Sequence, residues 1–210
     1  MSLLNELGKK YKTDKSTDGK RPGTAGQGHD YLRTYEKYLE ANRLEVRSVL
    51  EVGVQKGASI RMWADYFPNA QIYGLDIAES ALAVTGDRIT IRLVDQSDAT
   101  ALTQFADECG PFDLIMEDGS HIWNHQIITL QTLLKYVTPG GKYIVEDLQT
   151  SYHAEWAGGN KTGVQYLLEC CEMILGDGRA KAHDDSFLQA LSTRVETIMA
   201  MRHAAVFFCK

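Results

Sequence analysis

Short, unbroken runs of apolar residues alternate with amphipathic segments along most of the chain. An apolar run of four to eight residues bounded by turn residues is typical of a buried strand, and apolar positions three and four apart predict a helix. We therefore expect strands at 48–54, 71–77, 89–94, 112–118 and 140–147, and helices at 59–67, 100–109, 124–137, 163–175 and 185–192. Strands that alternate with helices predict a parallel sheet covered on both faces.

The last two apolar runs, residues 195–201 and 204–210, are separated by almost nothing. So short a connection allows only an antiparallel hairpin. The expected fold is therefore α/β, a Rossmann-like doubly wound sheet that is mostly parallel and ends in a C-terminal antiparallel hairpin. Such a sheet binds ligands at the carboxyl ends of its strands, near the point where the strand order reverses.

The N-terminal part of the chain departs from this pattern. Residues 9–31 are rich in Lys, Gly, Thr and Asp and lack hydrophobic periodicity, which predicts a long mobile loop. Long loops are commonly either disordered arms or lids, and both interpretations remain open. A helix is expected at 30–43, because its tyrosines recur at helical spacing. We predict that residues 1–47 form an N-terminal loop and helix acting as a lid, and that residues 48–210 form a single ligand-binding domain.

Composition narrows the class of protein. The 210 residues are 44% hydrophobic and 24% charged, and no apolar stretch approaches the length of a membrane span. A net charge of −6 argues against a nucleic-acid partner, since such domains are normally basic on the binding face. The four cysteines have no metal-site spacing, and the N-terminus does not read as a signal peptide. We expect a cytoplasmic protein without a membrane partner.

Polar groups and glycines follow three successive predicted strands. Gly53 and Gly57 lie between the first strand and its helix, where glycine lets the backbone approach a ligand. Their spacing lacks the middle glycine of the dinucleotide fingerprint, so a pyrophosphate cradle is disfavoured. Asp76 ends the second strand at the position of a ribose-binding acid. The third strand ends in Asp95, Gln96 and Asp98, which offer polar groups to an adenine edge.

Acidic pairs end two further strands, at Glu117-Asp118 and Glu146-Asp147. Adjacent buried carboxylates repel one another unless a positive charge lies between them, and we expect a bound cation to supply it. Hard oxygen ligands favour magnesium or calcium over zinc, and we predict Mg²⁺. His121 would then lie near the metal as a general base. The alternative is that these residues are helix caps and turns.

The segments LEVGVQKG, IYGLDI, VDQSD, FDLIMEDGSH and TPGGKYIVEDL resemble the class I S-adenosylmethionine-dependent methyltransferases over roughly residues 48 to 148. The resemblance implies a methyltransferase domain at 48–210 with S-adenosylmethionine as cofactor. It also implies a cofactor site in which Glu51, Gly53 and Gly57 line the methionine end. In that site Asp76 holds the ribose, and Asp95 and Gln96 lie near the adenine. We include Glu117 among the cofactor-binding residues.

A closer resemblance covers nearly the whole chain. KYKTDK, GHDYLRTYEKYL, MEDGSHIWNHQ and IVEDLQTSY are similar to the metal-dependent sugar O-methyltransferases of macrolide biosynthesis, the mycinamicin and macrocin type. This resemblance implies Asp118, Glu146 and Asp147 as magnesium ligands, and His121 with Asp118 as catalytic residues. The chain has Glu117 where those relatives usually have Asp, and we expect it to lack their extra N-terminal domain.

The expected function is Mg²⁺-dependent transfer of a methyl group from S-adenosylmethionine to a hydroxyl of a small molecule, and a sugar of a glycosylated antibiotic is the favoured acceptor. A catechol-type O-methyltransferase, a nicotinamide-dependent oxidoreductase and a non-catalytic methyltransferase-like partner of an oxygenase are the alternatives. We also expect a homo-oligomer.

Overall fold

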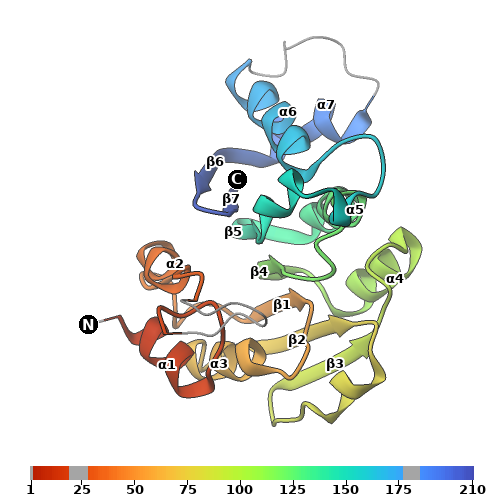
Figure 1. Cartoon of the computed structure of the whole chain (residues 1–210). Coiled ribbons are helices and arrows are strands. Elements are labelled where there is room, and N and C mark those ends of the chain that lie inside the picture. The colour runs from red at the N-terminus through yellow and green to blue at the C-terminus, as the bar shows by residue number, and fades with distance from the viewer. Residues whose placement is uncertain (1, 19–27, 177–184) are drawn as a thin grey trace.

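The computed structural model describes residues 2–18, 28–176 and 185–210. Its sheet has seven strands in the order β3-β2-β1-β4-β5-β7-β6, parallel except for β7, which runs antiparallel to both β5 and β6 (Figure 1). The strands are β1 Ser48–Val52, β2 Gln71–Asp76, β3 Ile89–Leu93, β4 Phe112–Glu117, β5 Val137–Val145, β6 Val195–Met201 and β7 Ala204–Cys209. This is the predicted fold, with the hairpin at the predicted place.

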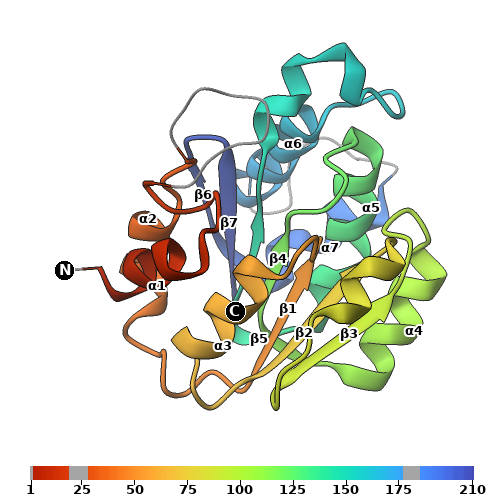
Figure 2. The same cartoon turned by 60° about the horizontal axis from the view of Figure 1, so that its bottom comes forward.

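Helices cover both faces of this sheet, as Figure 2 shows. The first three helices lie on one face: α1 Leu3–Tyr11, α2 Leu32–Leu39 and α3 Ala58–Tyr66. The other four lie on the opposite face: α4 Ala99–Cys109, α5 Trp123–Leu133, α6 Gly163–Leu175 and α7 Ser186–Arg194. Short 3₁₀ turns lie in the connections next to β2, β3 and β5: η1 Glu79–Ala83, η2 Leu134–Tyr136, η3 Leu148–Tyr152 and η4 Ala154–Trp156.

Each central strand contributes alternate side chains to two hydrophobic cores. On β1, Val49 packs with residues of α1 to α3, whereas its neighbour Leu50 packs with residues of α4 to α7. Both side chains are fully buried. This two-sided burial explains why the strand sequences are continuous apolar runs instead of alternating ones. No helix in the described ranges is long and apolar enough to cross a membrane, and the expected cytoplasmic location stays a prediction.

Three local expectations were wrong. The long loop predicted from Lys9 does not begin there, because α1 extends to Tyr11 and the turn that follows is packed into the protein; residues 19–27 of that loop lie outside the described part. The helix expected at 30–43 is shorter, with α2 ending at Leu39. Strand β5 starts at Val137 and runs through Pro139, which we expected to precede it, with a register irregularity opposite β4.

The carboxyl ends of β1, β4 and β5 are held together by backbone contacts. The amide of Asp118 donates to the carbonyl of Val52 at 2.9 Å, and the amide of Glu146 donates to the carbonyl of Glu117 at 2.9 Å. Gly53 has a positive φ of 96°, and a Cβ there would lie 2.0 Å from the carbonyl oxygen of Asp118. Only glycine permits this approach, and the approach brings the two predicted ligand regions into contact.

Glu117 ends β4 as a fully buried carboxylate. Its Oε1 accepts hydrogen bonds from the side chain of Gln96 and, at 3.3 Å, from the amide of Gly119. The Gln96 amide also donates to Thr129 of α5, so this network joins the end of β4 to the segment after β3 and to a helix. Burial raises the pKa of Glu117 to about 7, although His121 and the Gln96 hydrogen bond oppose that shift.

The buried Glu117 generates a pH-dependent prediction. Because its pKa lies above the ordinary value of 4.5, the folded protein binds the proton more tightly than the unfolded chain, and stability falls as pH rises through about 7. Glu117→Gln cannot ionise, so its unfolding free energy should exceed that of wild type by about 1 to 3 kcal/mol at pH 8, with a smaller excess at pH 5. Urea unfolding in EDTA buffer at both pH values measures this difference.

The matched control is Glu79→Gln, which changes an exposed glutamate and should leave the pH dependence of wild type unaltered. If the unfolding free energies of Glu117→Gln and wild type changed equally with pH, the raised pKa of Glu117 would be contradicted.

Candidate active site

A cavity of about 580 Å³ opens at the carboxyl ends of the parallel strands. Such a volume is in the range of small-molecule and cofactor sites. Its lining includes seven of the predicted site residues, namely Gly53, Asp76, Asp95, Gln96, Asp118, His121 and Asp147. Lys12, Thr13 and Asp14 of the N-terminal segment form another part of the wall. The predicted cofactor and metal residues therefore meet at one cavity.

Asp76 fixes the turn that begins this cavity. Its Oδ2 accepts from the amides of Val54 and Gln55 at 2.9 and 2.8 Å, and its Oδ1 accepts from the amide of Ala78 at 2.9 Å. Burial works to raise the pKa of Asp76, but these backbone donors outweigh it and the pKa is lowered. The carboxylate is thus ionised at neutral pH.

The segment after β3 divides into lining and capping residues. Asp95 accepts from the amide and hydroxyl of Ser97 at 2.8 and 2.7 Å. Gln96 accepts from the amide of Ser120 at 2.7 Å and connects this segment to the loop after β4. Asp98 instead caps α4, accepting from the amides of Thr100 and Ala101, and does not line the cavity. The expectation that Asp98 contacts an adenine edge is therefore not supported.

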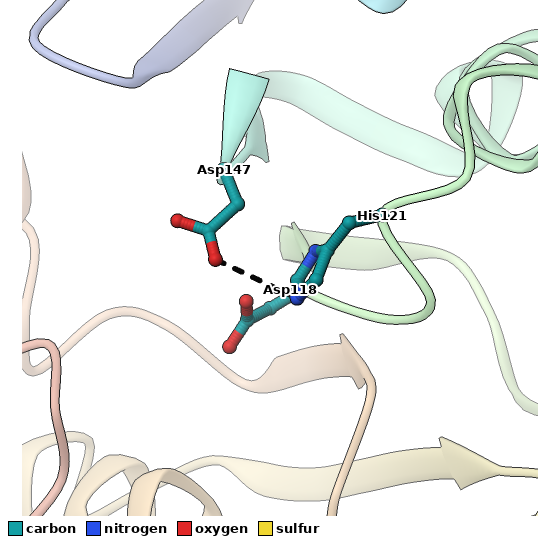
Figure 3. A group of neighbouring side chains, drawn as sticks. All are labelled: Asp118, His121 and Asp147. Carbon is teal, nitrogen blue, oxygen red and sulfur yellow. Dashed lines mark ion pairs between the residues drawn. The ribbon is translucent and has the colours of Figure 1, made fainter. Parts of the chain in front are cut away.

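Asp118, His121 and Asp147 converge on one point of the cavity wall. One potential ligand atom of each lies within 4.8 Å of those of the others (Figure 3). His121 Nε2 lies 3.5 Å from Asp147 Oδ2. His121 and Asp147 both have left-handed backbone conformations, with φ of 59° and 55°. Such strain in non-glycine residues is commonly retained where it orients functional side chains.

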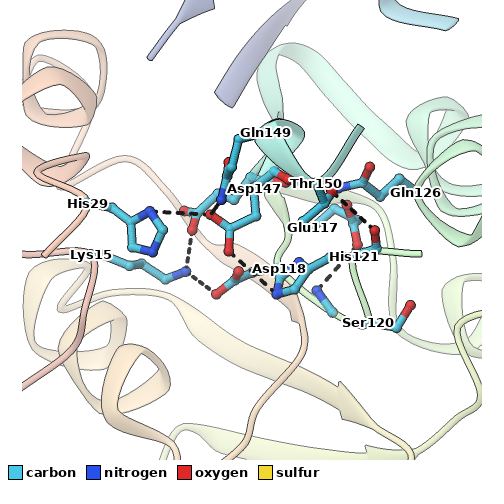
Figure 4. Close-up of polar contacts among 12 residues, drawn as sticks. Lys15, His29, Glu117, Asp118, Ser120, His121, Gln126, Asp147, Gln149 and Thr150 are labelled. Atoms are coloured by element: carbon cyan, nitrogen blue, oxygen red, sulfur yellow. Dashed lines mark hydrogen bonds and ion pairs between the residues drawn. The ribbon is translucent and has the colours of Figure 1, made fainter. Parts of the chain in front are cut away.

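Glu146 is not one of this group, and the ammonium of Lys15 contacts both its carboxylate and that of Asp118. Glu146 Oε2 accepts from the ammonium of Lys15 at 2.6 Å, and its Oε1 accepts from the hydroxyl of Tyr35 at 3.0 Å. Lys15 also contacts Asp118 Oδ2 (Figure 4). Its ammonium lies 3.6 Å from Glu51 Oε1. The positive charge that we expected between the acids is therefore supplied in this structure by a lysine of the protein itself.

The pKa values of these groups reflect burial and mutual charge. Burial alone would lower the pKa of Lys15, but Asp118, Glu146 and Glu51 outweigh it and keep the lysine strongly protonated. Burial raises the pKa of Glu146, and Lys15 only partly offsets this. Burial would also raise the pKa of Asp147, but His121, His29 and two hydrogen bonds lower it. Asp147 is consequently an ionised acid that faces the cavity.

The donor set fits a hard divalent cation. The carboxylates of Asp118 and Asp147 are hard oxygen ligands of the kind that Mg²⁺ or Mn²⁺ prefers, and the group has no thiolate, the ligand that softer metals prefer. Each oxygen of Glu146 accepts one hydrogen bond here and retains a second lone pair. The Nδ1 atom of His121 is buried and has no hydrogen-bond partner among the described residues.

Four predicted site residues lie behind the wall. Glu51, Gly57, Glu117 and Glu146 do not line the cavity. Glu51 accepts from the hydroxyl of Ser59, a lining residue, at 2.8 Å. Gly57 begins α3 between the lining residues Lys56 and Ala58, with a φ of 73°. These residues lie behind those that line the cavity.

The sequence interpretation missed several residues of the site. We assigned Lys15 to a mobile loop, although it is 1% exposed and contacts three carboxylates. The hydroxyl of Tyr31 donates to Asp147 at 2.9 Å, and His125, which we did not predict as a site residue, lines the cavity. The spacing of Tyr31 and Tyr35 on one helical face was the available signal, but it indicated only packing.

Comparisons with known proteins agree with this geometry. A family model described as a methyltransferase domain matches residues 50–148. Mycinamicin VI 2''-O-methyltransferase of Micromonospora griseorubida is 36% identical over 183 residues, which cover 82% of this chain and 41% of that protein. Demethylmacrocin O-methyltransferase of Streptomyces fradiae is 36% identical over 167 residues, covering 76% of this chain and 40% of that protein. The chain thus spans about two fifths of the length of these curated relatives.

A solved structure extends the match to nearly the whole chain. The MycE methyltransferase of the mycinamycin pathway, in complex with Mg, SAH and mycinamycin VI, has a TM-score of 0.82 and 30% identity. The match covers 98% of this chain and 54% of that one. The chain belongs to the class I S-adenosylmethionine-dependent methyltransferases and is related to the sugar O-methyltransferases of the mycinamicin and macrocin type.

Proposed function

We propose that this protein is a Mg²⁺-dependent O-methyltransferase that methylates a hydroxyl of a glycosylated natural product with S-adenosylmethionine. The observation that carries the proposal is the position of Asp118, His121 and Asp147 at the wall of the cavity formed by the strand ends. The names of the relatives, which are sugar O-methyltransferases of antibiotic pathways, support the acceptor class.

In the proposed reaction, the hydroxyl oxygen of the acceptor attacks the methyl carbon, the bond from carbon to sulfur breaks, and S-adenosylhomocysteine leaves. The hydroxyl proton passes to Nε2 of His121. Asp147, whose Oδ2 lies 3.5 Å from that nitrogen, stabilises the resulting imidazolium. The edge of Trp156 packs against the His121 ring, with centroids 5.7 Å apart, and limits its rotation.

A divalent cation bound by Asp118 and Asp147, with Glu146 as the third acid, would orient neighbouring hydroxyls and lower the pKa of one of them. Asp118 is therefore proposed to have both a metal-binding and a catalytic role. The carboxylate of Asp147 is held in place by three contacts to its Oδ1, from His29, Tyr31 and Gln149.

For S-adenosylmethionine, the proposal keeps the residue roles that the resemblance implies. Gly53 would contact the methionine end directly, whereas Glu51 would act from behind Ser59. Asp76 would accept from the ribose, and Asp95 and Gln96 would lie at the adenine. Glu117 would contribute by holding Gln96, to which it is hydrogen-bonded, since it does not itself line the cavity.

The expected homo-oligomer remains part of the proposal. Leu168 and Leu175 are 58% and 87% exposed and lie seven residues apart on α6. This spacing places them on one face of the helix, where a second copy would bury them.

The first test is calorimetric titration of S-adenosylhomocysteine into EDTA-treated protein, with NAD as the control ligand. We expect binding of S-adenosylhomocysteine alone, because the wall lacks the glycine pattern of a dinucleotide site. Turnover is then measured with S-adenosylmethionine and Mg²⁺ against glycosides and catechols. If only catechols are methylated, the protein is a catechol-type O-methyltransferase. If NAD binds and S-adenosylhomocysteine does not, the proposal is wrong.

The second test replaces the proposed base. His121→Ala should reduce kcat by roughly 10²- to 10⁴-fold, the usual contribution of a general base, while the affinity for S-adenosylhomocysteine in calorimetry changes little. His153→Ala, which removes an exposed histidine, is the control and should retain wild-type turnover. Turnover of His121→Ala close to that of wild type would show that another group takes the proton.

We also propose that residues 1–47 cover the cavity as a lid. Lys12, Thr13 and Asp14 belong to the cavity wall, so a ligand in the cavity would hold this segment in place. Bound S-adenosylhomocysteine should therefore slow tryptic cleavage after Lys9, Lys10 and Lys12. Cleavage after Lys161, which is exposed and does not line the cavity, is the control within the same digest, and equal cutting at all sites in both states would contradict the lid.

A further inference from the structure

The ammonium group of Lys15 is buried among acids that come from three different strands. It lies 2.6 Å from Glu146 Oε2 after β5, contacts Asp118 Oδ2 after β4, and is 3.6 Å from Glu51 Oε1 on β1. Only 1% of Lys15 is exposed to solvent. A buried lysine is costly unless it is paired, and here it touches both the proposed cofactor region and the proposed metal region.

The backbone around Lys15 is held at several points. Its carbonyl accepts from the amide of Tyr31 at 3.0 Å, and the neighbouring Ser16 hydroxyl donates to the carbonyl of Thr13 at 2.9 Å. Thr13 and Ser16 are themselves buried, and the amide of Thr13 donates to Gly8 of α1. The lysine is therefore attached to a packed turn, and its ammonium has a fixed position.

Helix α2 and the residue before it add two further donors to the same acids. The hydroxyl of Tyr31 donates to Asp147 Oδ1 at 2.9 Å, and the hydroxyl of Tyr35 donates to Glu146 Oε1 at 3.0 Å. Together with Lys15, these tyrosines give each of Asp118, Glu146 and Asp147 at least one donor from the N-terminal segment. Two of the three proposed metal ligands, Asp118 and Glu146, are thus contacts of Lys15, whereas Asp147 is contacted by Tyr31.

We propose that Lys15 is a positioning residue of the metal centre: its ammonium orients Asp118 and Glu146 so that the centre can bind a divalent cation, and Tyr31 and Tyr35 assist it. The inference rests on the proposed metal centre. Without the ammonium, Glu51 and Glu146 would be buried acids lacking their cationic partner, and Asp118 would lose the contact that fixes its carboxylate. The opposite role, in which Lys15 competes with the cation for the acids, predicts the opposite change in affinity.

The test measures Mn²⁺ affinity directly, from the electron paramagnetic resonance signal of free Mn²⁺, without cofactor or acceptor. Lys15→Met removes the charge and keeps most of the side-chain volume, and its Kd for Mn²⁺ should rise by about tenfold or more, as with other residues that orient metal ligands. Lys15→Arg should recover part of the affinity, because it restores a cation. Lys10→Met is the matched control, since Lys10 pairs with Asp65 at an exposed site on the same segment.

An unchanged or lower Kd in Lys15→Met would overturn the proposal, and equal weakening in Lys15→Met and Lys15→Arg would assign the effect to packing and overturn the role of the charge. Circular dichroism and urea unfolding establish that each variant is folded. If Lys15→Met fails to fold, Tyr31→Phe and Tyr35→Phe replace it, with a rise of a few fold expected in each and unchanged affinity in both counting against the proposal. Absence of Mn²⁺ binding by wild type would instead overturn the proposed metal centre itself.

Discussion

The arrangement of this protein depends on the neutralisation of carboxylates buried at one edge of its sheet. Glu51, Glu117 and Glu146 are each at most 1% exposed; Glu51 is the next-to-last residue of β1, Glu117 ends β4 and Glu146 follows β5. Charges in such positions are tolerated only when paired or protonated. Lys15 pairs with Glu146, Glu51 shares Lys15 and the hydroxyl of Ser59, and a raised pKa lets Glu117 take up a proton. The cavity can form at this edge because these charges are balanced.

The sheet and most of the cavity could be predicted from local sequence. Strands buried on both faces are continuous apolar runs, and parallel topology then brings their ends, with Asp76 and Asp118, to one edge. Lys15 could not be predicted in this way. It lies in a polar segment that is typical of solvent-exposed loops, and its acidic partners are 103 and 131 residues away in the chain. Burial of a charge depends on such distant partners, which local composition does not reveal.

The orientation of Glu146 likewise depends on partners that are distant in the chain. Glu146 and Asp147 follow the last residue of β5, and Asp147 has a left-handed φ of 55°. Glu146 accepts from Tyr35 of α2 and from Lys15. Asp147 accepts from Tyr31 and also lies against His121. The pair thus connects the packed N-terminal segment with the cavity, and a shift of α2 would be felt at both acids.

The distance along the chain between Lys15 and Glu146 has a consequence for synthesis on the ribosome. Lys15 emerges early, and its partner follows 131 residues later. At a typical elongation rate this interval is roughly 7 to 26 seconds, far longer than a helix or hairpin needs to form. During that time the lysine remains hydrated, and its turn cannot adopt the buried position seen here. The N-terminal segment therefore docks only after β5 has been made, so a segment that is synthesised before the strands of the sheet reaches its final place after them.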